Sequence, residues 1–213
     1  MIFEIDDLRI DMIDADDRMV LHMQQGDGYE HDSLVAWSKM VKPGLVALDI
    51  GAYTGLFSII AKMRGADVVA FEPMPAQQFR LGINAKQNKV YVTVMPIAVS
   101  DRCSVMRLNY NQNVPLTTGA GLDANIDMHN SYFDVDCVSI DALKLKTVGA
   151  IKIDVERHEP CVLRGAMQTI ERDRPSLLIE TLDDDMRQEV LRLLPRYTVA
   201  AVLDKRNTMF TPL

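Results

Sequence analysis

The amino-acid sequence predicts a doubly wound α/β fold, in which a mostly parallel sheet carries helices on both faces. Three stretches support this prediction, at residues 45–61, 67–87 and 150–170. Each begins with a short run of apolar, β-type residues, passes through a turn with polar side chains, and continues at helical spacing. Strands that alternate with helices along a chain form parallel sheets. With 213 residues and 48% hydrophobic content, the chain suits one domain.

Residues 1–30 are predicted to be an acidic β extension that precedes a core at residues 31–213. Phe3–Ile5, Leu8–Met12 and Met19–Met23 are short apolar runs separated by acidic turns. This pattern indicates short strands that include a hairpin. An apolar hairpin could also pair across a two-fold axis, so a homodimer is a possible assembly.

A helix is predicted over Ser33–Val41, with Asp32 as its N-cap. Because this helix leads into the first core strand, the loop before it should lie over the same crevice as the glycine turn that follows. Tyr29 and His31 are therefore candidates for ligand contact. The alternative is that both are ordinary loop residues.

The first core strand ends in a turn with two glycines, Gly51 and Gly55, behind the acidic residue Asp49. Glycine lets the backbone approach a ligand closely, and the free N–H groups of the following helix face the same crevice. The spacing Gly-x-x-x-Gly differs from the Gly-x-Gly-x-x-Gly of dinucleotide-binding proteins. It resembles motif I of the class I S-adenosylmethionine (SAM) methyltransferases; the alternative is an ordinary turn between a strand and a helix. The resemblance assigns SAM binding to Asp49, Gly51, Ala52, Tyr53 and Gly55.

The next strand ends at Glu72, 21 residues after Gly51. In a parallel sheet this places the carboxylate beside the glycine turn. A carboxylate in that position can accept hydrogen bonds from both ribose hydroxyls of a nucleoside. The alternative is a solvated acid at a strand end.

A third strand is predicted over Val90–Ile97, where apolar residues alternate after a helix at residues 76–87. In the methyltransferases that the glycine turn resembles, the end of this strand lies under the base. The resemblance therefore implies that backbone groups near Ala98 and the side chain of Ser100 or Asp101 bind adenine. Ser100 and Asp101 are also ordinary turn residues.

The periodicity weakens after this strand. Val105–Asn109 and Val135–Ile140 indicate two strands, and between them Asn111–Ser131 is rich in Asn, Gly and Thr. Loops of this length inside a domain are usually functional or disordered. We interpret this one as a flap on the substrate side.

A second group of polar residues follows the apolar strand at residues 150–153, before a helix that runs from Pro160 to about Ile170. This stretch and the strand after it resemble the signature of the FkbM family of SAM-dependent methyltransferases. The resemblance covers about residues 32–180. The matching residues of the signature are Lys152–Glu156, Glu159, Val162–Ala166 and Leu177–Glu180.

Members of this family methylate hydroxyl groups, often on sugars or natural products. The resemblance therefore implies SAM as cofactor, O-methylation as reaction and a seven-stranded sheet. One position departs from the family, which usually has glycine where this chain has Arg157. If the backbone there needs a positive φ, an arginine costs about 1 kcal/mol or more.

Asp154, Glu156 and His158 lie where a general base would be needed to take the proton of the hydroxyl. His158 has the pKa best placed near neutrality among them. In other interpretations Asp154 orients the methionine amino group, and Glu159 caps the helix. Glu180 could also join the three residues around a divalent cation, but no metal site is assigned.

The last part of the chain is predicted to complete the sheet. Pro175–Thr181 reads as a parallel strand that brings Glu180 to the crevice, and Asp183–Leu194 as an amphipathic helix. Tyr197–Leu203 and Thr208–Phe210 indicate an antiparallel pair, with Lys205-Arg206-Asn207 as its turn.

Composition limits the classes of function. Residues 1–17 contain seven acids and one arginine, so the rest of the chain is close to neutral and has no basic stripe. This disfavours nucleic acid and favours a small-molecule or carbohydrate acceptor. Cys103, Cys137 and Cys161 suggest neither a disulfide framework nor a zinc site. Without a signal-peptide pattern or a membrane-spanning apolar run, a cytoplasmic protein without membrane contact is expected.

Two other functions remain open from the sequence. A nucleotide (NAD)-dependent oxidoreductase would use the same architecture, although the dinucleotide fingerprint is missing. A non-catalytic SAM-binding protein would result if Arg157 closed the acceptor site.

Overall fold

The computed structural model describes residues 1–24, 30–114, 116–117, 119–122 and 129–213. Within these ranges the central sheet is built from seven strands. They are β3 (Val46–Ile50), β4 (Asp67–Phe71), β5 (Thr93–Met95), β9 (Val148–Ile153), β10 (Ser176–Glu180), β11 (Tyr197–Leu203) and β12 (Asn207–Pro212).

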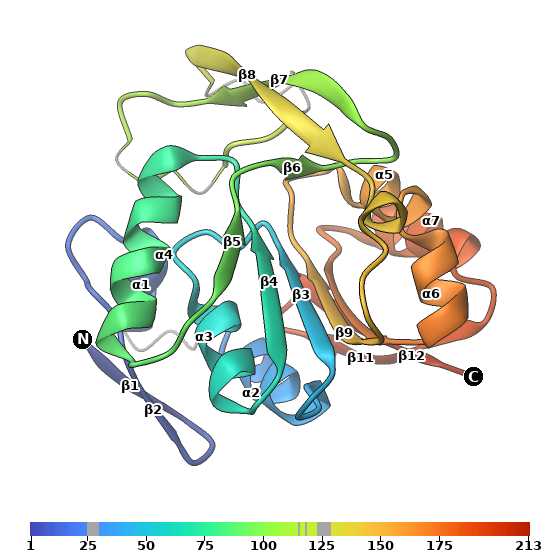
Figure 1. The fold of residues 1–213 in the computed structure, drawn as a ribbon, viewed down its shortest axis with the longest axis horizontal. Coiled ribbons are helices and arrows are strands. Elements are labelled where there is room, and N and C mark those ends of the chain that lie inside the picture. The colour runs from blue at the N-terminus through green and yellow to red at the C-terminus, as the bar shows by residue number, and fades with distance from the viewer. Residues whose placement is uncertain (25–29, 115, 118, 123–128) are drawn as a thin grey trace.

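The strand order is β11-β12-β10-β9-β3-β4-β5 (Figure 1). The neighbours from β10 to β5 are parallel, whereas β12 runs antiparallel to both β10 and β11. The mostly parallel seven-stranded sheet expected from the sequence is therefore confirmed. Because all five parallel strands point the same way, their carboxyl ends lie along one edge of the sheet.

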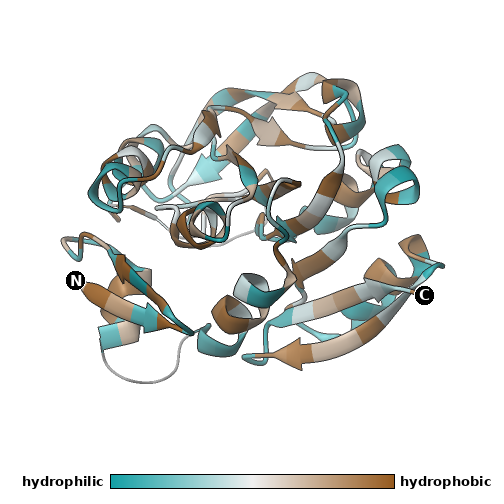
Figure 2. Cartoon of the chain, turned by 60° about the horizontal axis from the view of Figure 1, so that its bottom comes forward, coloured by the Kyte–Doolittle hydropathy of each residue, from teal (hydrophilic) through white to brown (hydrophobic). Residues whose placement is uncertain are grey.

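Helices cover both faces of this sheet. They are α2 (His31–Met40), α3 (Leu56–Met63) and α4 (Pro75–Gln87) on one face, and α5 (Glu159–Arg164), α6 (Met167–Asp173) and α7 (Asp184–Leu193) on the other. Consecutive residues of one strand face opposite sides of the sheet and pack in different cores. Ala47 and Ala150 pack with the first group of helices, and Leu48 and Ile151 pack with the second. Strands buried on both faces are apolar throughout, and much of the sheet is brown in Figure 2. The doubly wound arrangement is confirmed.

The N-terminal hairpin is also confirmed, but the third predicted strand is wrong. β1 (Ile2–Ile5) pairs antiparallel with β2 (Leu8–Asp11). Met19–Met23 instead lies in the helix α1 (Arg18–Gln24). The buried Asp17 accepts a hydrogen bond from the Val20 N–H at 3.2 Å, which is the geometry of a helix N-cap.

A second sheet lies across the carboxyl ends of the parallel strands (Figure 1). It consists of β6 (Ala98–Val99), β7 (Ser104–Tyr110) and β8 (Ser131–Val138), in the order β6-β8-β7. The two strands predicted before and after the long loop are confirmed as the antiparallel pair β7 and β8. The strand predicted over Val90–Ile97 is shorter, since only Thr93–Met95 pairs with β4.

The helix predicted from Pro160 to about Ile170 is divided into α5 and α6. A Cβ at Gly165, between them, would lie 2.1 Å from the carbonyl oxygen of Ser100. Asp141, in the short 3-10 helix η1 (Ile140–Leu143), accepts hydrogen bonds from the N–H groups of Gln168 and Thr169. Contacts with Ser100 and Asp141 therefore interrupt the helix. The apolar pattern of residues 160–170 does not show these contacts.

Candidate functional site

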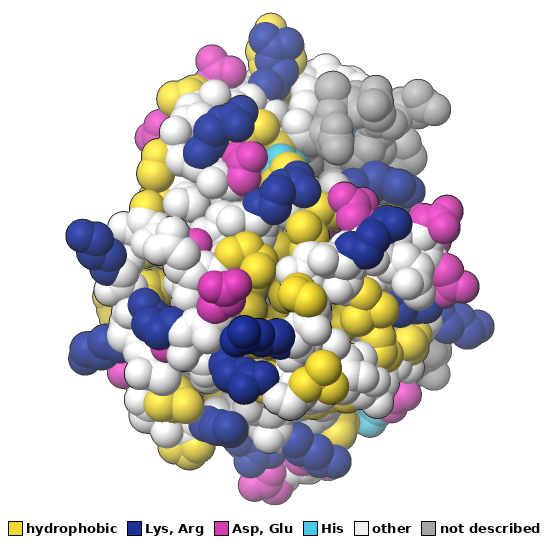
Figure 3. Space-filling model, turned by 90° about the vertical axis from the view of Figure 1, so that its right-hand side faces the viewer, with side chains coloured by type: hydrophobic (Ala, Val, Ile, Leu, Met, Phe, Trp, Pro, Cys, Tyr) yellow, Lys and Arg dark blue, Asp and Glu magenta, His cyan; other side chains and the backbone are white. Residues whose placement is uncertain are grey.

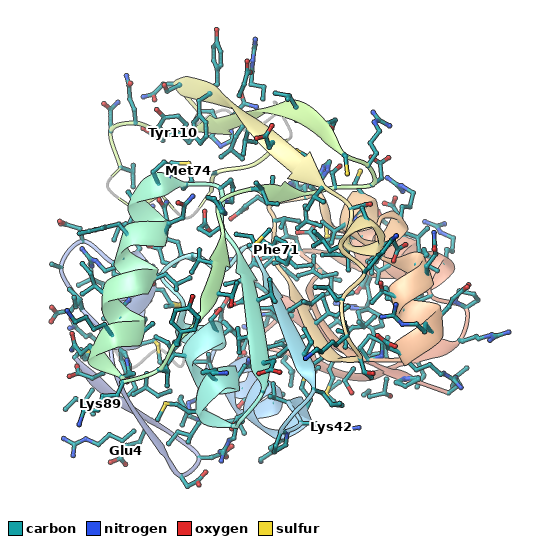
Figure 4. All side chains as sticks on the ribbon, viewed as in Figure 1. Glu4, Lys42, Phe71, Met74, Lys89 and Tyr110 are labelled. Atoms are coloured by element: carbon teal, nitrogen blue, oxygen red, sulfur yellow. The ribbon has the colours of Figure 1, made fainter. Side chains whose placement is uncertain are left out.

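A cavity lies between the carboxyl ends of the parallel strands and the small sheet above them. The volume of this cavity is about 140 Å³. In Figure 4, Phe71 lies near the end of β4, Met74 at the start of α4, and Tyr110 above them on the small sheet. The polar wall residues include Glu30, Tyr53, Glu72, Gln77, Lys152, Asp154, Glu156, Glu180 and Arg206.

The glycine turn between β3 and α3 forms one wall. Gly51 has φ of 82° and packs against the end of β9, where a Cβ would lie 1.8 Å from the carbonyl oxygen of Asp154. Gly55 has φ of 94° and packs against Leu81 of α4. Glycine is therefore needed at both positions to bring β3, β9 and α4 together. Of the residues predicted here, Gly51, Ala52 and Tyr53 line the cavity.

Asp49 is fully buried beneath this turn and is not one of the described residues that line the cavity. Its Oδ2 atom accepts a hydrogen bond of 2.6 Å from the Ser58 hydroxyl of α3. Burial raises the pKa of Asp49, and the charge of Lys152 opposes this shift. Asp49 ties the end of β3 to α3, so it shapes the turn from below.

Glu72 lies at the end of β4 with 6% of its surface exposed. Its Oε2 accepts the N–H of Tyr53 at 2.8 Å, and its Oε1 accepts the N–H of Met74 at 2.9 Å. Burial raises the pKa of Glu72 to about 7, although both N–H groups favour the charged form. Each carboxylate oxygen can accept a further hydrogen bond, so Glu72 is fixed in position and can still bind two hydroxyl groups.

The end of β9 carries an ion pair. Lys152 Nζ lies 3.2 Å from Asp154 Oδ2 and 4.6 Å from the centre of the Phe57 ring. Burial opposes the charged form of Lys152, but the carboxylates of Asp154, Asp49 and Glu30 raise its pKa above the usual value. This lysine therefore remains a cation in the wall of the cavity.

Glu156 and Glu180 complete the acidic side of the cavity. Burial and the nearby Asp154 carboxylate raise the pKa of Glu156 to about 7. The same two causes raise the pKa of Glu180, and Arg206 opposes them with an ion pair of 2.6 Å. The structure therefore brings Asp154, Glu156 and Glu180 to one cavity, at the ends of β9 and β10.

The turn between β11 and β12 contributes Arg206 and also holds α2. Asp204 accepts hydrogen bonds from the N–H groups of Asp32 at 3.2 Å and Ser33 at 2.8 Å. The prediction that Asp32 is the N-cap is wrong, because α2 begins at His31 and the distant Asp204 caps it. Sequence reasoning treated Arg206 as a turn residue; its partner Glu180 is far away along the chain.

His158 and Ser100 contact each other. The Ser100 hydroxyl lies 2.9 Å from His158 Nε2, both side chains are buried, and neither is among the described residues that line the cavity. Ala98 does line it. Glu159 is fully buried and accepts the N–H of Val155 at 3.0 Å, which holds the loop before α5. Of the three residues grouped as candidate bases, Asp154 and Glu156 therefore line the cavity, whereas His158 contacts Ser100.

Comparison with known proteins shows the family of the chain. A model described as the methyltransferase FkbM domain matches residues 49–198. The chain belongs to the FkbM methyltransferase family. The 31-O-demethyl-FK506 methyltransferase FkbM of Streptomyces tacrolimicus is 30% identical, over 59% of this chain and 60% of the relative. The chain thus spans about 60% of that relative's length.

Solved structures of methyltransferases share the fold. The methyltransferase FkbM from Methylobacillus flagellatus KT has a TM-score of 0.53 at 15% identity, over 94% of this chain and 55% of that one. The magnesium protoporphyrin IX methyltransferase of Synechocystis PCC 6803, solved with bound SAM, has a TM-score of 0.54 at 14% identity, over 92% and 85%. The class I SAM methyltransferase fold is therefore confirmed.

At the position where FkbM methyltransferases usually have glycine, Arg157 has φ of 76°. Glu156 before it has φ of 55°, so two consecutive residues adopt the left-handed conformation. Arginine is strained in this region. The side chain of Arg157 is exposed and is not one of the described residues that line the cavity.

Part of the predicted flap covers the cavity. The Tyr53 hydroxyl donates to the carbonyl oxygen of Leu116 at 2.9 Å, and Gln77 Nε2 donates to that of Thr117 at 2.9 Å. The loop between β7 and β8 is therefore attached to the glycine turn and to α4. Residues 115, 118 and 123–128 of this loop lie outside the described residues, as does Tyr29; His31 is exposed.

Three further findings concern partners. In the described part of the chain, no group of three or more His, Cys, Asp or Glu residues could hold a metal ion. None of the described helices is long and apolar enough to cross a membrane. On the face that carries α5, α6 and α7, Lys and Arg side chains are interspersed with acidic, apolar and uncharged ones (Figure 3).

Proposed function

We propose that this FkbM-family protein transfers a methyl group from SAM to a hydroxyl group of a small molecule or sugar. The observation that carries the proposal is Glu72, a buried carboxylate fixed beside the glycine turn with acceptor capacity left for two hydroxyls. The name of the Streptomyces relative, which refers to an O-demethyl acceptor, supports a hydroxyl as the group that is methylated.

The residues present fit the cofactor. Glu72 would accept hydrogen bonds from the ribose hydroxyls, and the turn at Gly51, Ala52 and Tyr53, which lines the cavity, would contact the cofactor. Ala98, which lines the cavity, remains the candidate for contact with adenine, whereas the Ser100 hydroxyl faces His158. When bound, SAM supplies an already activated methyl group. The protein therefore has to align the hydroxyl and take its proton.

Glu156 is the residue that we favour as the general base. It lines the cavity, and its pKa of about 7 balances basicity against deprotonation near neutral pH. Glu156 would take the proton of the acceptor hydroxyl, whose oxygen would gain the methyl group as the bond between that group and the SAM sulfur breaks and SAH leaves. Asp154 also lines the cavity, but its ion pair with Lys152 holds the carboxylate in place and suits a positioning role. His158 would support the loop through Ser100.

The test is calorimetric titration with S-adenosylhomocysteine (SAH) and, separately, with NAD. We expect SAH to bind the wild type and NAD to give no response. Hydrogen bonds to a charged group contribute about 1.5–3 kcal/mol each, so Glu72→Ala should weaken SAH binding about tenfold or more. Glu189→Ala, which removes an exposed carboxylate of α7, is the control and should bind SAH as the wild type does. Absence of SAH binding to the wild type would refute the proposal, and NAD binding would revive the oxidoreductase.

A further inference from the structure

We propose that the acceptor is a hydroxylated amine, such as an amino sugar, whose protonated amine is held by Glu180 and the carboxylates beside it. The inference rests on the proposed methyl transfer and specifies the chemistry of its acceptor. It follows from the charges, the hydrogen bonds and the position of one end of the cavity.

The charged groups of the cavity wall are not balanced at the end formed by β9 and β10. Among the described residues that line this end, the carboxyl groups outnumber the cations by two, and burial together with this crowding raises the pKa values of Glu156 and Glu180. Burial makes unpaired charge costly, and the neighbouring carboxylates repel one another. A ligand with a positive charge would relieve this repulsion, whereas a neutral one would not. The groups concerned are Glu30, Asp154, Glu156 and Glu180 on one side, and Lys152 and Arg206 on the other.

Glu180 has an atom that needs a partner. Only 2% of the residue is exposed, and its Oε1 is paired with Arg206 at 2.6 Å. No described residue forms a hydrogen bond with its Oε2. A buried acceptor left in this state is unfavourable, because it has lost contact with water and gained no donor in exchange. An ammonium group offers three donors and no acceptor, so it matches this atom.

Asn207 lies directly opposite Glu180 in the antiparallel pair of β10 and β12, behind the described residues that line the cavity. It is 1% exposed, and among the described residues nothing forms a hydrogen bond with its side-chain nitrogen or oxygen. Unsatisfied donors and acceptors beside an unsatisfied carboxylate indicate a polar occupant.

Glu180 lies away from Glu72, where the nucleoside of the cofactor is expected to bind. Glu72 lies on β4, on one side of β3 and its glycine turn, whereas β10 lies on the other side, beyond β9. Neighbouring strands are about 4.8 Å apart, so β10 lies roughly 10 Å from β3. The nucleoside would occupy the β4 side, and the acidic end is then left for the acceptor. A metal ion is a poorer occupant, because the described residues contain no group of three ligands.

The experiment compares three sugars that differ only at one position. SAH-saturated protein is titrated with glucosamine, glucose and N-acetylglucosamine. We expect glucosamine to bind about tenfold or more tightly than the two neutral sugars. Glu180→Gln should abolish this preference and leave SAH affinity within about threefold of wild type. Glu189→Gln, the same change at an exposed site of α7, should alter neither. Glu30→Gln, which removes another carboxylate of this end of the cavity, serves the same comparison if circular dichroism shows that Glu180→Gln is unfolded.

Three results of the sugar titrations would overturn the inference: equal or tighter binding of the neutral sugars, no binding of glucosamine, or a preference that survives Glu180→Gln. A loss of SAH affinity of about tenfold in Glu180→Gln would also overturn it, because the carboxylate would then serve the cofactor. Failure of SAH binding in the wild type concerns the proposed function instead. The sugar titrations, repeated without SAH, would in that case still decide whether these carboxylates hold an amine.

Discussion

At the scale of single residues, Gly51 is the position where the site tolerates least change. It has φ of 82°, and a Cβ there would lie 1.8 Å from the backbone oxygen of Asp154. A backbone atom cannot rotate away as a side chain can, so Gly51→Ala must move the turn or the end of β9. We expect a loss of about 3 kcal/mol or more in the free energy of unfolding, from strain and overpacking together. Urea denaturation measures this loss, and calorimetry should show weaker SAH binding.

Gly82 offers the matched control. It lies in the middle of α4, it is exposed, and nothing lies within 4 Å of a Cβ built there. Gly82→Ala should therefore raise the free energy of unfolding by about 0.5–1 kcal/mol, as expected for glycine replaced inside a helix. Equal effects of the two substitutions would contradict the special role of Gly51.

At the scale of elements, prediction succeeded where local sequence and tertiary contacts agree. The units β3-α3 and β4-α4 combine an apolar strand, a turn with glycine or proline, and a helical pattern, and the structure confirms both. It failed at Met19–Met23, where the cap from Asp17 makes a helix, and at the predicted helix 160–170, which Gly165 interrupts. In both cases the apolar pattern of the sequence does not show the contact that decides the conformation. That contact is the Asp17 cap in the first case and the close packing of Gly165 against Ser100 in the second.

The same limit applies to the site. Glu72, Asp154 and Glu156 were predicted because each follows a strand that reaches the same edge of the sheet. Lys152 was noted only as part of the signature, and Arg206 only as part of a turn. Their roles depend on partners from other strands, and a single sequence does not show which strands are neighbours.

The turn between β11 and β12 gives a prediction at this scale. Asp204 accepts hydrogen bonds from two N–H groups at the start of α2, on Asp32 and Ser33. Asp204→Ala should lower the free energy of unfolding by about 1 kcal/mol, the usual cost of losing a helix cap. Asp204→Asn keeps an acceptor oxygen and should cost less. Both values come from urea denaturation.

The control for this prediction is Glu171→Ala, which removes an exposed acid of α6. Its effect should stay within about 0.5 kcal/mol. If Asp204→Ala has no larger effect than this control, the turn does not stabilise α2.

At the scale of the whole molecule, the site combines two sheets with the helical layer that contains α3 and α4. The parallel sheet supplies the carboxylates from its carboxyl ends, and the small sheet of β6, β7 and β8 covers them. The arrangement buries acids that an unfolded chain would expose to water. The functional site should therefore make the stability of the ligand-free protein depend on pH.

Glu72 allows this dependence to be measured, since burial raises its pKa from 4.5 to about 7. The folded state then holds a proton that the unfolded state has lost, so the stabilisation is complete below about pH 4.5 and disappears as the pH rises through 7. Between pH 5 and 8 the wild type should lose about 2–3 kcal/mol more of its unfolding free energy than Glu72→Gln does. Urea denaturation of both proteins across this range tests the prediction. The other buried carboxylates are present in both proteins and cancel in the difference, so parallel curves would mean that Glu72 keeps an ordinary pKa.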